Sequence, residues 1–282
     1  MIILLGSNGQ LGREMQKTLT KNRMEFAAYD YPEIDLTRKS TLEKVISNGA
    51  GTVINCAAYT NVDAAEADRD KAYAINADGP KYLAQICNEK DIELVHISTD
   101  YVFDGEAILE DGEPRAYIET DKCAPGTVYG KTKLAGENAV RKYHDRYYIL
   151  RTAWLYGNGN NFVKTMIGMA ENKDKIKVVN DQTGSPTSTA QLAQAIVSLL
   201  GSGKYGLYHA TCEGRCTWYE FAKKIFEIKR KDVEIIPVTS SEFICAAQRP
   251  HWSVLENKGL KEIGENNFSF WQDALEVYLK DN

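Results

Sequence analysis

The chain begins MIILLGSNGQLG (residues 1–12), and this segment is the most informative about its fold. Its apolar run, Ile2 to Leu5, is typical of a buried strand, and a helix is predicted from Gly9 to Lys21. The glycines between them have GxxGxxG spacing, so the backbone can approach a pyrophosphate at a helix N-terminus. The stretch therefore predicts a dinucleotide site, formed by Gly6, Asn8, Gly9, Gln10, Leu11 and Gly12.

Strand-like and helix-like segments alternate beyond this stretch. Further strands are predicted at Glu25–Tyr29, Thr52–Asn55, Glu93–Ser98 and Tyr147–Arg151, and further helices at Ala72–Asn88 and Tyr129–Tyr143. Such alternation indicates βαβ units. We therefore expect a doubly wound, Rossmann-like α/β fold, with a parallel sheet covered by helices on both faces.

The pattern loosens after Arg151. Helices are predicted at Gln191–Leu200 and Trp218–Glu227 and a strand at Glu234–Val238, with no repeat or low-complexity linker between them. We expect residues 1–150 to form the dinucleotide-binding core. Residues 151–282 should form mainly a small substrate-binding lobe, with some segments returning to the core.

Composition excludes several classes of protein. The apolar and charged fractions, 43% and 26%, are ordinary for a globular protein. No apolar run approaches the roughly 18 residues of a membrane span, and the first residues lack the basic lead-in of a signal peptide. A net charge of −5 argues against nucleic acid as a partner. We expect a cytoplasmic protein that binds neither nucleic acid nor membrane.

The six cysteines are scattered without a CxxC pair, which favours reduced thiols over a disulfide framework. His209, Cys212 and Cys216 suggest zinc, but structural zinc ligands are usually paired at tighter spacing and need a fourth member. No metal is expected.

Asp30 closes the second predicted strand, where a carboxylate can accept hydrogen bonds from the adenosine ribose. Its charge would repel a ribose phosphate, so NADH is expected to be preferred, with NADPH possible. Asp35 is the alternative for this role. The small residues Cys56, Ala57 and Ala58 after the third strand would let the cofactor lie over the sheet edge.

Tyr129 and Lys133 are the strongest catalytic candidates. Residues four apart on a helix share a face, so the phenol and the ammonium should enter one site. A nearby cation favours the phenolate and should lower the tyrosine pKa. Thr99 follows the fourth strand, and ligands of open parallel sheets bind at strand carboxyl ends, so it should meet Tyr129 there.

The chain resembles the extended short-chain dehydrogenases and, within them, the dTDP-4-dehydrorhamnose reductases. The motifs run in order over nearly its whole length, and STDYVFDG, RTAWLYG and DQTGSPT are the most specific. They are GSNGQLG (Gly6–Gly12), NCAAYTNVDAAE (Asn55–Glu66), INADGP (Ile75–Pro80), STDYVFDG (Ser98–Gly105), YGKTKLAGE (Tyr129–Glu137), RTAWLYG (Arg151–Gly157), DQTGSPT (Asp181–Thr187) and RPHWSVL (Arg249–Leu255).

The resemblance implies reduction of a C4 keto sugar attached to dTDP, giving dTDP-L-rhamnose. Thr99 would hydrogen-bond the ketone, Tyr129 would protonate it, and Lys133 would bind the nicotinamide ribose. Cofactor contacts would also include Leu36, Tyr59, Ile97 and Ser98. Substrate contacts would include Thr60, Val62, Asp100, Tyr101, Trp154, Asn161, Gln182 and Arg249.

Two departures from the family pattern stand out. The segment between Asp104 and Pro125 is longer than usual, which suggests a surface loop or a lid, the loop being favoured. Some relatives dimerise through magnesium; Glu14 could match one ligand, but Ser188 to Gln191 offers no acid. We expect a monomer or weak homodimer.

Two alternatives remain open at this point. One is an NAD(P)-binding regulatory subunit like that of methionine adenosyltransferase, which shares this fold. The other is a related epimerase or dehydratase. Dehydratases of this superfamily carry two acidic residues directly after the threonine, whereas here Asp100 is followed by Tyr101, which favours simple reduction.

Overall fold

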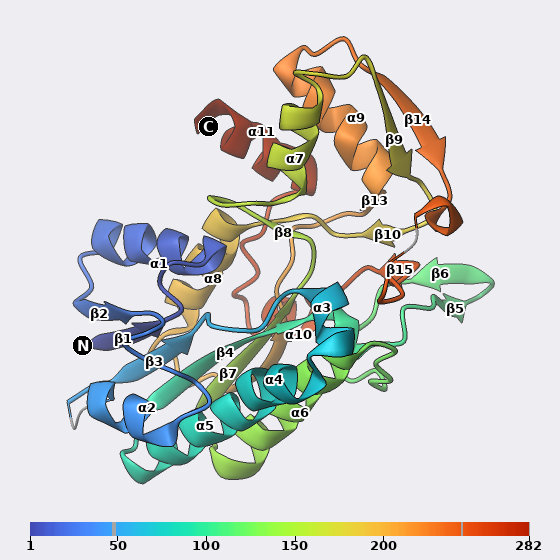
Figure 1. Ribbon diagram of the computed structural model, residues 1–282. Helices are drawn as coiled ribbons and strands as arrows, with labels where there is room; N and C mark the ends of the chain where they lie inside the picture. Colours follow the sequence, from blue (N-terminus) through green and yellow to red (C-terminus); the bar gives the residue numbers. More distant parts are fainter. Residues whose placement is uncertain (47–48, 244, 282) are drawn as a thin grey trace.

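A six-stranded parallel sheet forms the centre of the molecule in the computed structural model, which describes residues 1–46, 49–243 and 245–281 (Figure 1). The strands lie in the order β12-β7-β4-β3-β1-β2. Their bounds are β1 (Ile2–Leu5), β2 (Phe26–Tyr29), β3 (Thr52–Asn55), β4 (Glu93–Thr99), β7 (Tyr147–Thr152) and β12 (Gly206–His209). The chain leaves β1 toward β2 and then crosses to β3, which creates a switch point between β1 and β3.

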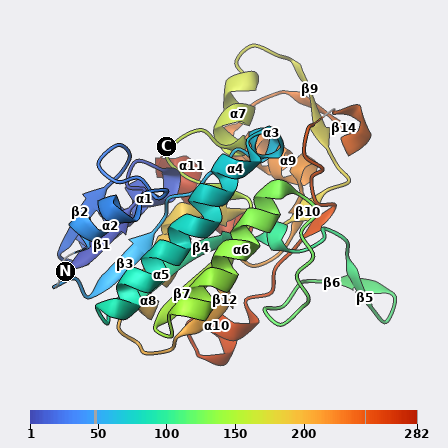
Figure 2. The same ribbon diagram turned by 60° about the horizontal axis from the view of Figure 1, so that its bottom comes forward.

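Helices cover both faces of this sheet (Figures 1 and 2). One face carries α1 (Gln10–Lys21) and α8 (Thr189–Leu199), and the other carries α2 (Lys39–Val45), α5 (Gly79–Glu89) and α6 (Val128–Tyr143). In β1, Ile2 and Leu4 pack with the α1 side, while Ile3 and Leu5 pack with the α2 side. This two-sided burial explains the unbroken apolar run, and the predicted doubly wound fold is confirmed.

A smaller lobe lies beyond the carboxyl ends of the strands. It contains the parallel pair β9 (Lys175–Val179) and β14 (Glu234–Val238), packed near α7 (Phe162–Met169), α9 (Trp218–Lys229) and α11 (Trp271–Asp281). Its short strands are β8 (Leu155–Tyr156), β10 (Thr183–Gly184), β11 (Thr187–Ser188), β13 (Cys216–Thr217) and β15 (Trp252–Ser253).

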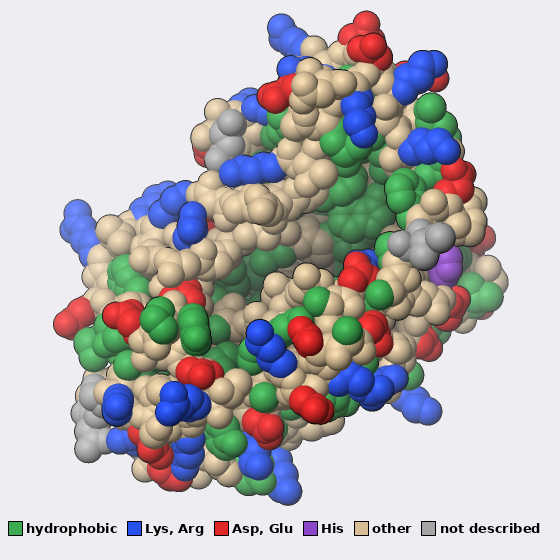
Figure 3. Space-filling view, viewed as in Figure 1, with side chains coloured by type: hydrophobic (Ala, Val, Ile, Leu, Met, Phe, Trp, Pro, Cys, Tyr) green, Lys and Arg blue, Asp and Glu red, His purple; other side chains and the backbone are tan. Residues whose placement is uncertain are grey.

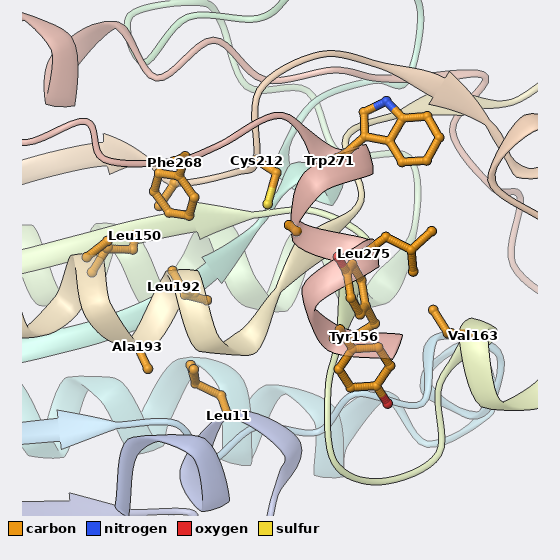
Figure 4. Close-up of a cluster of buried hydrophobic side chains, with 14 of the residues drawn as sticks. Leu11, Leu150, Tyr156, Val163, Leu192, Ala193, Cys212, Phe268, Trp271 and Leu275 are labelled. Carbon is orange, nitrogen blue, oxygen red and sulfur yellow. The ribbon is translucent and has the colours of Figure 1, made fainter. Parts of the chain in front are cut away.

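The lobe shares its hydrophobic core with the sheet. Tyr156, Val163 and Trp271 of the lobe belong to the same buried cluster as Leu11 of α1 and Leu192 of α8 (Figure 4). The packing is therefore continuous from one face of the sheet into the lobe.

The helix predicted from Ala72 to Asn88 is interrupted. It consists of α4 (Arg69–Tyr73), a π-helical turn η1 (Ala74–Asp78) and α5. Pro80 has no N–H to donate to the carbonyl of Asn76, which disturbs the helical ladder at this point. Gly136 of α6 packs against that carbonyl so closely that a Cβ there would lie 2.2 Å from it.

The long segment after Asp104 contains a hairpin of β5 (Ile108–Glu110) and β6 (Glu113–Arg115). The indole of Trp252 donates a hydrogen bond to the carbonyl of Arg115 at 3.0 Å and so anchors the last residue of the hairpin. The remaining short helices are α3 (Val62–Ala67), η2 (Asp100–Val102), η3 (Ser240–Glu242) and α10 (Lys258–Glu262). Within the described ranges, no helix has the length and apolarity to cross a bilayer.

Candidate active site

A cavity of about 1040 Å³ lies at the carboxyl ends of the parallel strands, around the β1/β3 switch point. Figure 3 shows a hollow with hydrophobic side chains between the sheet and the lobe. The turn after β1, the ends of β2 to β4, the start of α6 and the residues after β7 all line the cavity. We call it the sheet cavity.

The glycine turn suits a pyrophosphate. Gly6 has φ +76°, and a Cβ there would lie 2.5 Å from the amide nitrogen of Ala57. Helix α1 begins beside it with neither a side-chain cap nor an acidic residue in its first turn. Its N–H groups and dipole are therefore available to an anion at the cavity wall formed by Gly9, Gln10 and Leu11. These residues fit a dinucleotide.

Asp30 lies at the cavity wall and accepts two backbone hydrogen bonds. Its carboxylate binds the N–H of Asn8 at 2.6 Å and that of Tyr31 at 2.7 Å. Asp35 also lines the cavity, where one oxygen accepts both the N–H and the hydroxyl of Thr37. Both predicted acids are thus fixed at the end where an adenosine ribose would lie.

Thr99, Tyr129 and Lys133 meet in the sheet cavity. The Thr99 hydroxyl donates to Asp100 Oδ1 at 2.8 Å and is also hydrogen-bonded to the Tyr129 phenol. The Tyr129 ring packs edge-on against Tyr101, with centroids 5.5 Å apart. The Lys133 ammonium donates to the carbonyl of Ile97 at 2.6 Å. The N-cap Thr127, which accepts from Gly130, starts α6 so that its first turns face the cavity. The structure therefore brings the three predicted side chains together.

The electrostatics differ from the expectation in one respect. Burial raises the pKa of Tyr129, the nearby Asp100 raises it further, and the Thr99 hydrogen bond lowers it. Burial also lowers the pKa of Lys133 to about 8, against the opposing effect of Glu137. The expectation that Lys133 lowers the tyrosine pKa is therefore not met in this structure: the group that favours the phenolate is Thr99.

A buried ion pair connects the end of β7 to α6. Arg151 at the end of β7 binds Glu137 through two nitrogens, at 2.7 and 2.9 Å, and both side chains are at most 2% exposed. Ser98 donates to the same carboxylate at 2.5 Å. Glu137 lies one turn beyond Lys133, so β4, β7 and α6 are tied together beneath the predicted catalytic side chains.

A second cavity of about 1020 Å³ adjoins the first through Tyr101 and Trp154. Trp154 has φ +46° and stacks on Trp218, with ring centroids 3.4 Å apart. Phe162, Met166 and Met169 of α7 add apolar wall, and Gln182 and Arg249 are polar members. The Arg249 guanidinium pairs with Asp63 of α3 at 2.5 Å. We call this second space the lobe cavity.

Most predicted site residues line one of these two cavities. The exceptions are Asn8, Gly12, Tyr59 and Asn161. Gly12 permits close packing, since a Cβ there would lie 2.0 Å from the Gly6 carbonyl oxygen. Asn161 caps α7 and binds the side chain of Gln10 at 3.2 Å, so it links the lobe to α1.

Sequence reasoning missed several cavity residues. Lys71 and Ile75 come from the interrupted helix, Thr152 is the last residue of β7, and the α7 residues lie in a helix that was not predicted. The strand predicted at Tyr147–Arg151 ends just before Thr152, so its place at the carboxyl end of a strand could have identified it. The suggested zinc residue His209 instead contacts the carbonyls of Tyr117 and Glu256. Among the described residues, no cluster of three or more His, Cys, Asp or Glu side chains could hold a metal ion.

A doubly wound sheet with a glycine turn after β1, and Thr, Tyr and Lys side chains meeting at the strand ends, defines a protein of the short-chain dehydrogenase type. The chain belongs to the RmlD substrate binding domain family, whose model matches residues 1–282.

Known relatives support this assignment. The chain is 38% identical over 282 residues to dTDP-4-dehydrorhamnose reductase of Mycobacterium tuberculosis, with 99% of this chain and 92% of the relative covered. A crystal structure of such a reductase from Clostridium acetobutylicum has a TM-score of 0.95 and 45% identity, covering 99% and 98%. The reductase of Bacillus anthracis in complex with NADP has a TM-score of 0.95 and 40% identity, covering 100% and 99%.

Proposed function

We propose that this protein is an NAD(P)H-dependent reductase of the C4 keto group of dTDP-4-dehydro-6-deoxy-L-mannose, with dTDP-L-rhamnose as product. The meeting of Thr99, Tyr129 and Lys133 in the sheet cavity carries the proposal. The identity of 45% to a dTDP-4-dehydrorhamnose reductase over 99% of the chain supports the choice of substrate.

The three side chains have separate tasks. A reduced nicotinamide, when bound, supplies the hydride that adds to the keto carbon. Thr99 donates a hydrogen bond to the keto oxygen and holds it beside Tyr129. Tyr129 gives its phenolic proton to that oxygen as negative charge develops on it; the raised pKa keeps the phenol protonated before the reaction. Lys133 binds the nicotinamide ribose, and the Thr99 hydroxyl favours the phenolate that remains.

The two cavities divide the ligands between them. Residues 1–150 hold the cofactor through the glycine turn, Asp30 or Asp35, and the strand ends. Residues 151–282 supply most of the nucleotide-sugar site, in which Trp154 and Gln182 line the lobe cavity. Thr60 and Val62 line the sheet cavity beside the sugar, and Arg249 offers a planar fork to the diphosphate.

NADH is the preferred cofactor in this proposal. Asp30 is held by backbone N–H groups of Asn8 and Tyr31, so its negative charge is fixed at the cavity wall. A ribose phosphate there would be repelled by the negative charge of this carboxylate. The B. anthracis reductase was solved with NADP, so NADPH is the second cofactor to test.

We further propose a cytoplasmic monomer or weak homodimer that binds neither nucleic acid nor membrane. The net charge of −5 and the free cysteines are consistent with this setting. Light scattering across a concentration series would measure the mass; a stable tetramer would contradict the proposal.

Loss of NADH absorbance after addition of the dTDP-keto sugar tests the function. We expect one NADH consumed per sugar reduced, with dTDP-L-rhamnose identified by NMR. The same sugar attached to UDP serves as a control for nucleotide recognition. No NADH or NADPH oxidation with any keto-sugar nucleotide would contradict the proposal.

A further inference from the structure

Asp100 is the buried acid of the site that the scheme above leaves without a task in proton transfer. It is 4% exposed, follows Thr99 directly and lines the sheet cavity. Its Oδ1 lies 2.8 Å from the Thr99 hydroxyl, and its Oδ2 is buried without a hydrogen-bond partner among the described residues. Burial of a carboxyl group favours its protonated form, because the charged form loses its hydration.

The Thr99 hydroxyl joins this acid to the tyrosine. Its oxygen lies within hydrogen-bond distance of Asp100 Oδ1 and accepts the N–H of Tyr101 at 3.2 Å, and it hydrogen-bonds the Tyr129 phenol. A hydroxyl can accept a proton on one side while it donates one on the other. Asp100, Thr99 and Tyr129 therefore form a continuous chain of exchangeable protons.

We propose that Asp100 supplies the proton that restores Tyr129 after each reduction, passed through the Thr99 hydroxyl. This inference rests on the proposed function, since reduction leaves Tyr129 as a phenolate. The O–H bond of Asp100 breaks as its proton moves to Thr99 Oγ1. The Thr99 proton moves to the phenolate, and the Asp100 carboxylate regains a proton from water.

The surroundings suit this task near neutral pH. Burial raises the pKa of Asp100 to about 7, opposed by hydrogen bonds from Thr99 and, on β15, Ser253. The titratable neighbours of Asp100 are Tyr101 and Tyr129. The charge of Arg249 lowers the pKa of Tyr101, and that of Asp63 raises it. An acid with a pKa close to the working pH both gives and regains a proton readily.

Rapid mixing of Asp100→Asn with NADH and the dTDP-keto sugar distinguishes a proton supplier from a substrate contact. Tyr129 starts protonated, so the first turnover should keep nearly the wild-type rate. Later turnovers should slow by about 10- to 100-fold, giving a burst of one NADH per enzyme. KM should remain nearly unchanged, and the slow phase should show a larger solvent isotope effect than wild type. Added formate should raise the rate of the later turnovers in Asp100→Ala toward the wild-type rate.

Asp63→Asn is the matched control, because it removes a carboxylate of this region that has no hydrogen bond to Thr99 or Tyr129. At saturating substrate it should show no new burst. A raised KM with normal later turnovers in Asp100→Asn would make Asp100 a substrate contact and overturn the relay. Equal slowing of all turnovers, or wild-type kinetics, would also overturn it.

Infrared difference spectra of the ligand-free protein provide a readout that needs no turnover. A protonated carboxyl band should titrate near pH 7 in wild type and be missing in Asp100→Asn. A wild-type protein that shows this band but oxidises no NADH would refute the proposed function and the relay with it. Full wild-type turnover without the band would refute the relay alone.

Discussion

At the residue scale, the site depends on a partly buried tyrosine. Tyr129 is kept protonated by burial and by the nearby Asp100, while the Thr99 hydroxyl favours the phenolate. These opposing effects suit a group that must hold a proton before the reaction and release it during the reaction. Neither Thr99 nor Lys133 carries a proton to the ketone in the proposed scheme.

Tyr129→Phe should therefore abolish turnover, with a loss of about 100-fold or more in kcat. The ring remains, so its packing against Tyr101 and the binding of NADH should be nearly intact. Steady-state rates and NADH fluorescence titration measure the two effects. Near-normal rates in this variant would remove Tyr129 from its assigned role.

Asp30→Ala should relax the preference for NADH. The substitution removes a fixed negative charge from the cavity wall, so the ratio of kcat/KM for NADH over NADPH should fall by about tenfold. Asp35→Ala is the matched comparison, because Asp35 lines the same cavity but binds Thr37 instead. An unchanged ratio in Asp30→Ala with a changed ratio in Asp35→Ala would assign the role to Asp35.

At the element scale, α6, which carries Tyr129 and Lys133, packs closely against the π-helical turn η1. Gly136 faces the Asn76 carbonyl, and the Asn76 side chain bonds both Thr132 of α6 and the backbone of Tyr59. The side chain of Asn76 thus connects the helix that carries Tyr129 and Lys133 to the loop after β3.

Gly136→Ala should push α6 away from η1. A Cβ 2.2 Å from the Asn76 oxygen cannot be accommodated without a backbone shift, so the free energy of unfolding should fall by about 1–3 kcal/mol. Turnover should fall as well, because Tyr129 and Lys133 move with the helix. Chemical denaturation and kcat are the measurements.

Gly168→Ala in α7 is the control, since nothing lies within 4 Å of a Cβ there. Alanine in that helix should be neutral or stabilising by up to about 1 kcal/mol. Equal stability of the Gly136 and Gly168 variants would contradict the packing argument.

The elements around the sheet cavity were predictable from sequence because their signals are local. The run from Ile2 to Leu5 and the helix of Tyr129 follow directly from apolar runs and spacing. Strand β12 was missed because its four residues form a strand only by pairing with β7, which is far away in the sequence. Glu137 and Arg151 lay in recognised motifs, but their ion pair becomes visible only when β7 lies beside α6.

At the scale of the whole molecule, buried histidines link folding to pH. Burial lowers the pKa of His96, His144 and His209 below the ordinary value of 6.5. As the pH falls through 6.5, the unfolded chain takes up protons that the folded protein does not bind, so stability is lost. Asp100 opposes this trend, because its raised pKa makes the folded state bind a proton first.

The free energy of unfolding should therefore decrease between about pH 6.5 and 5, by up to about 1.4 kcal/mol per pH unit for each such histidine. Urea denaturation at successive pH values measures this slope. His144→Gln keeps a donor for the Ile92 carbonyl and should reduce the slope. A stability independent of pH in this range would contradict the burial of these rings as neutral groups.

The joint between sheet and lobe gives the protein its two adjoining cavities, and Tyr101 and Trp154 line both. Under the proposed function, the nicotinamide and the reacting sugar would meet in the sheet cavity, and the nucleotide part of the substrate would extend into the lobe cavity. Sequence could not predict it, because the lobe cavity is built from segments between Tyr101 and His251 whose contacts depend on the fold.

A crystal structure of the complex with NADH and dTDP-L-rhamnose would show whether Tyr129 and Thr99 face the reacting group of the sugar. We expect the nicotinamide in the sheet cavity, with the sugar 4-hydroxyl within hydrogen-bond distance of Tyr129 and Thr99. A dinucleotide bound elsewhere, or a sugar oxygen that contacts neither side chain, would contradict this expectation.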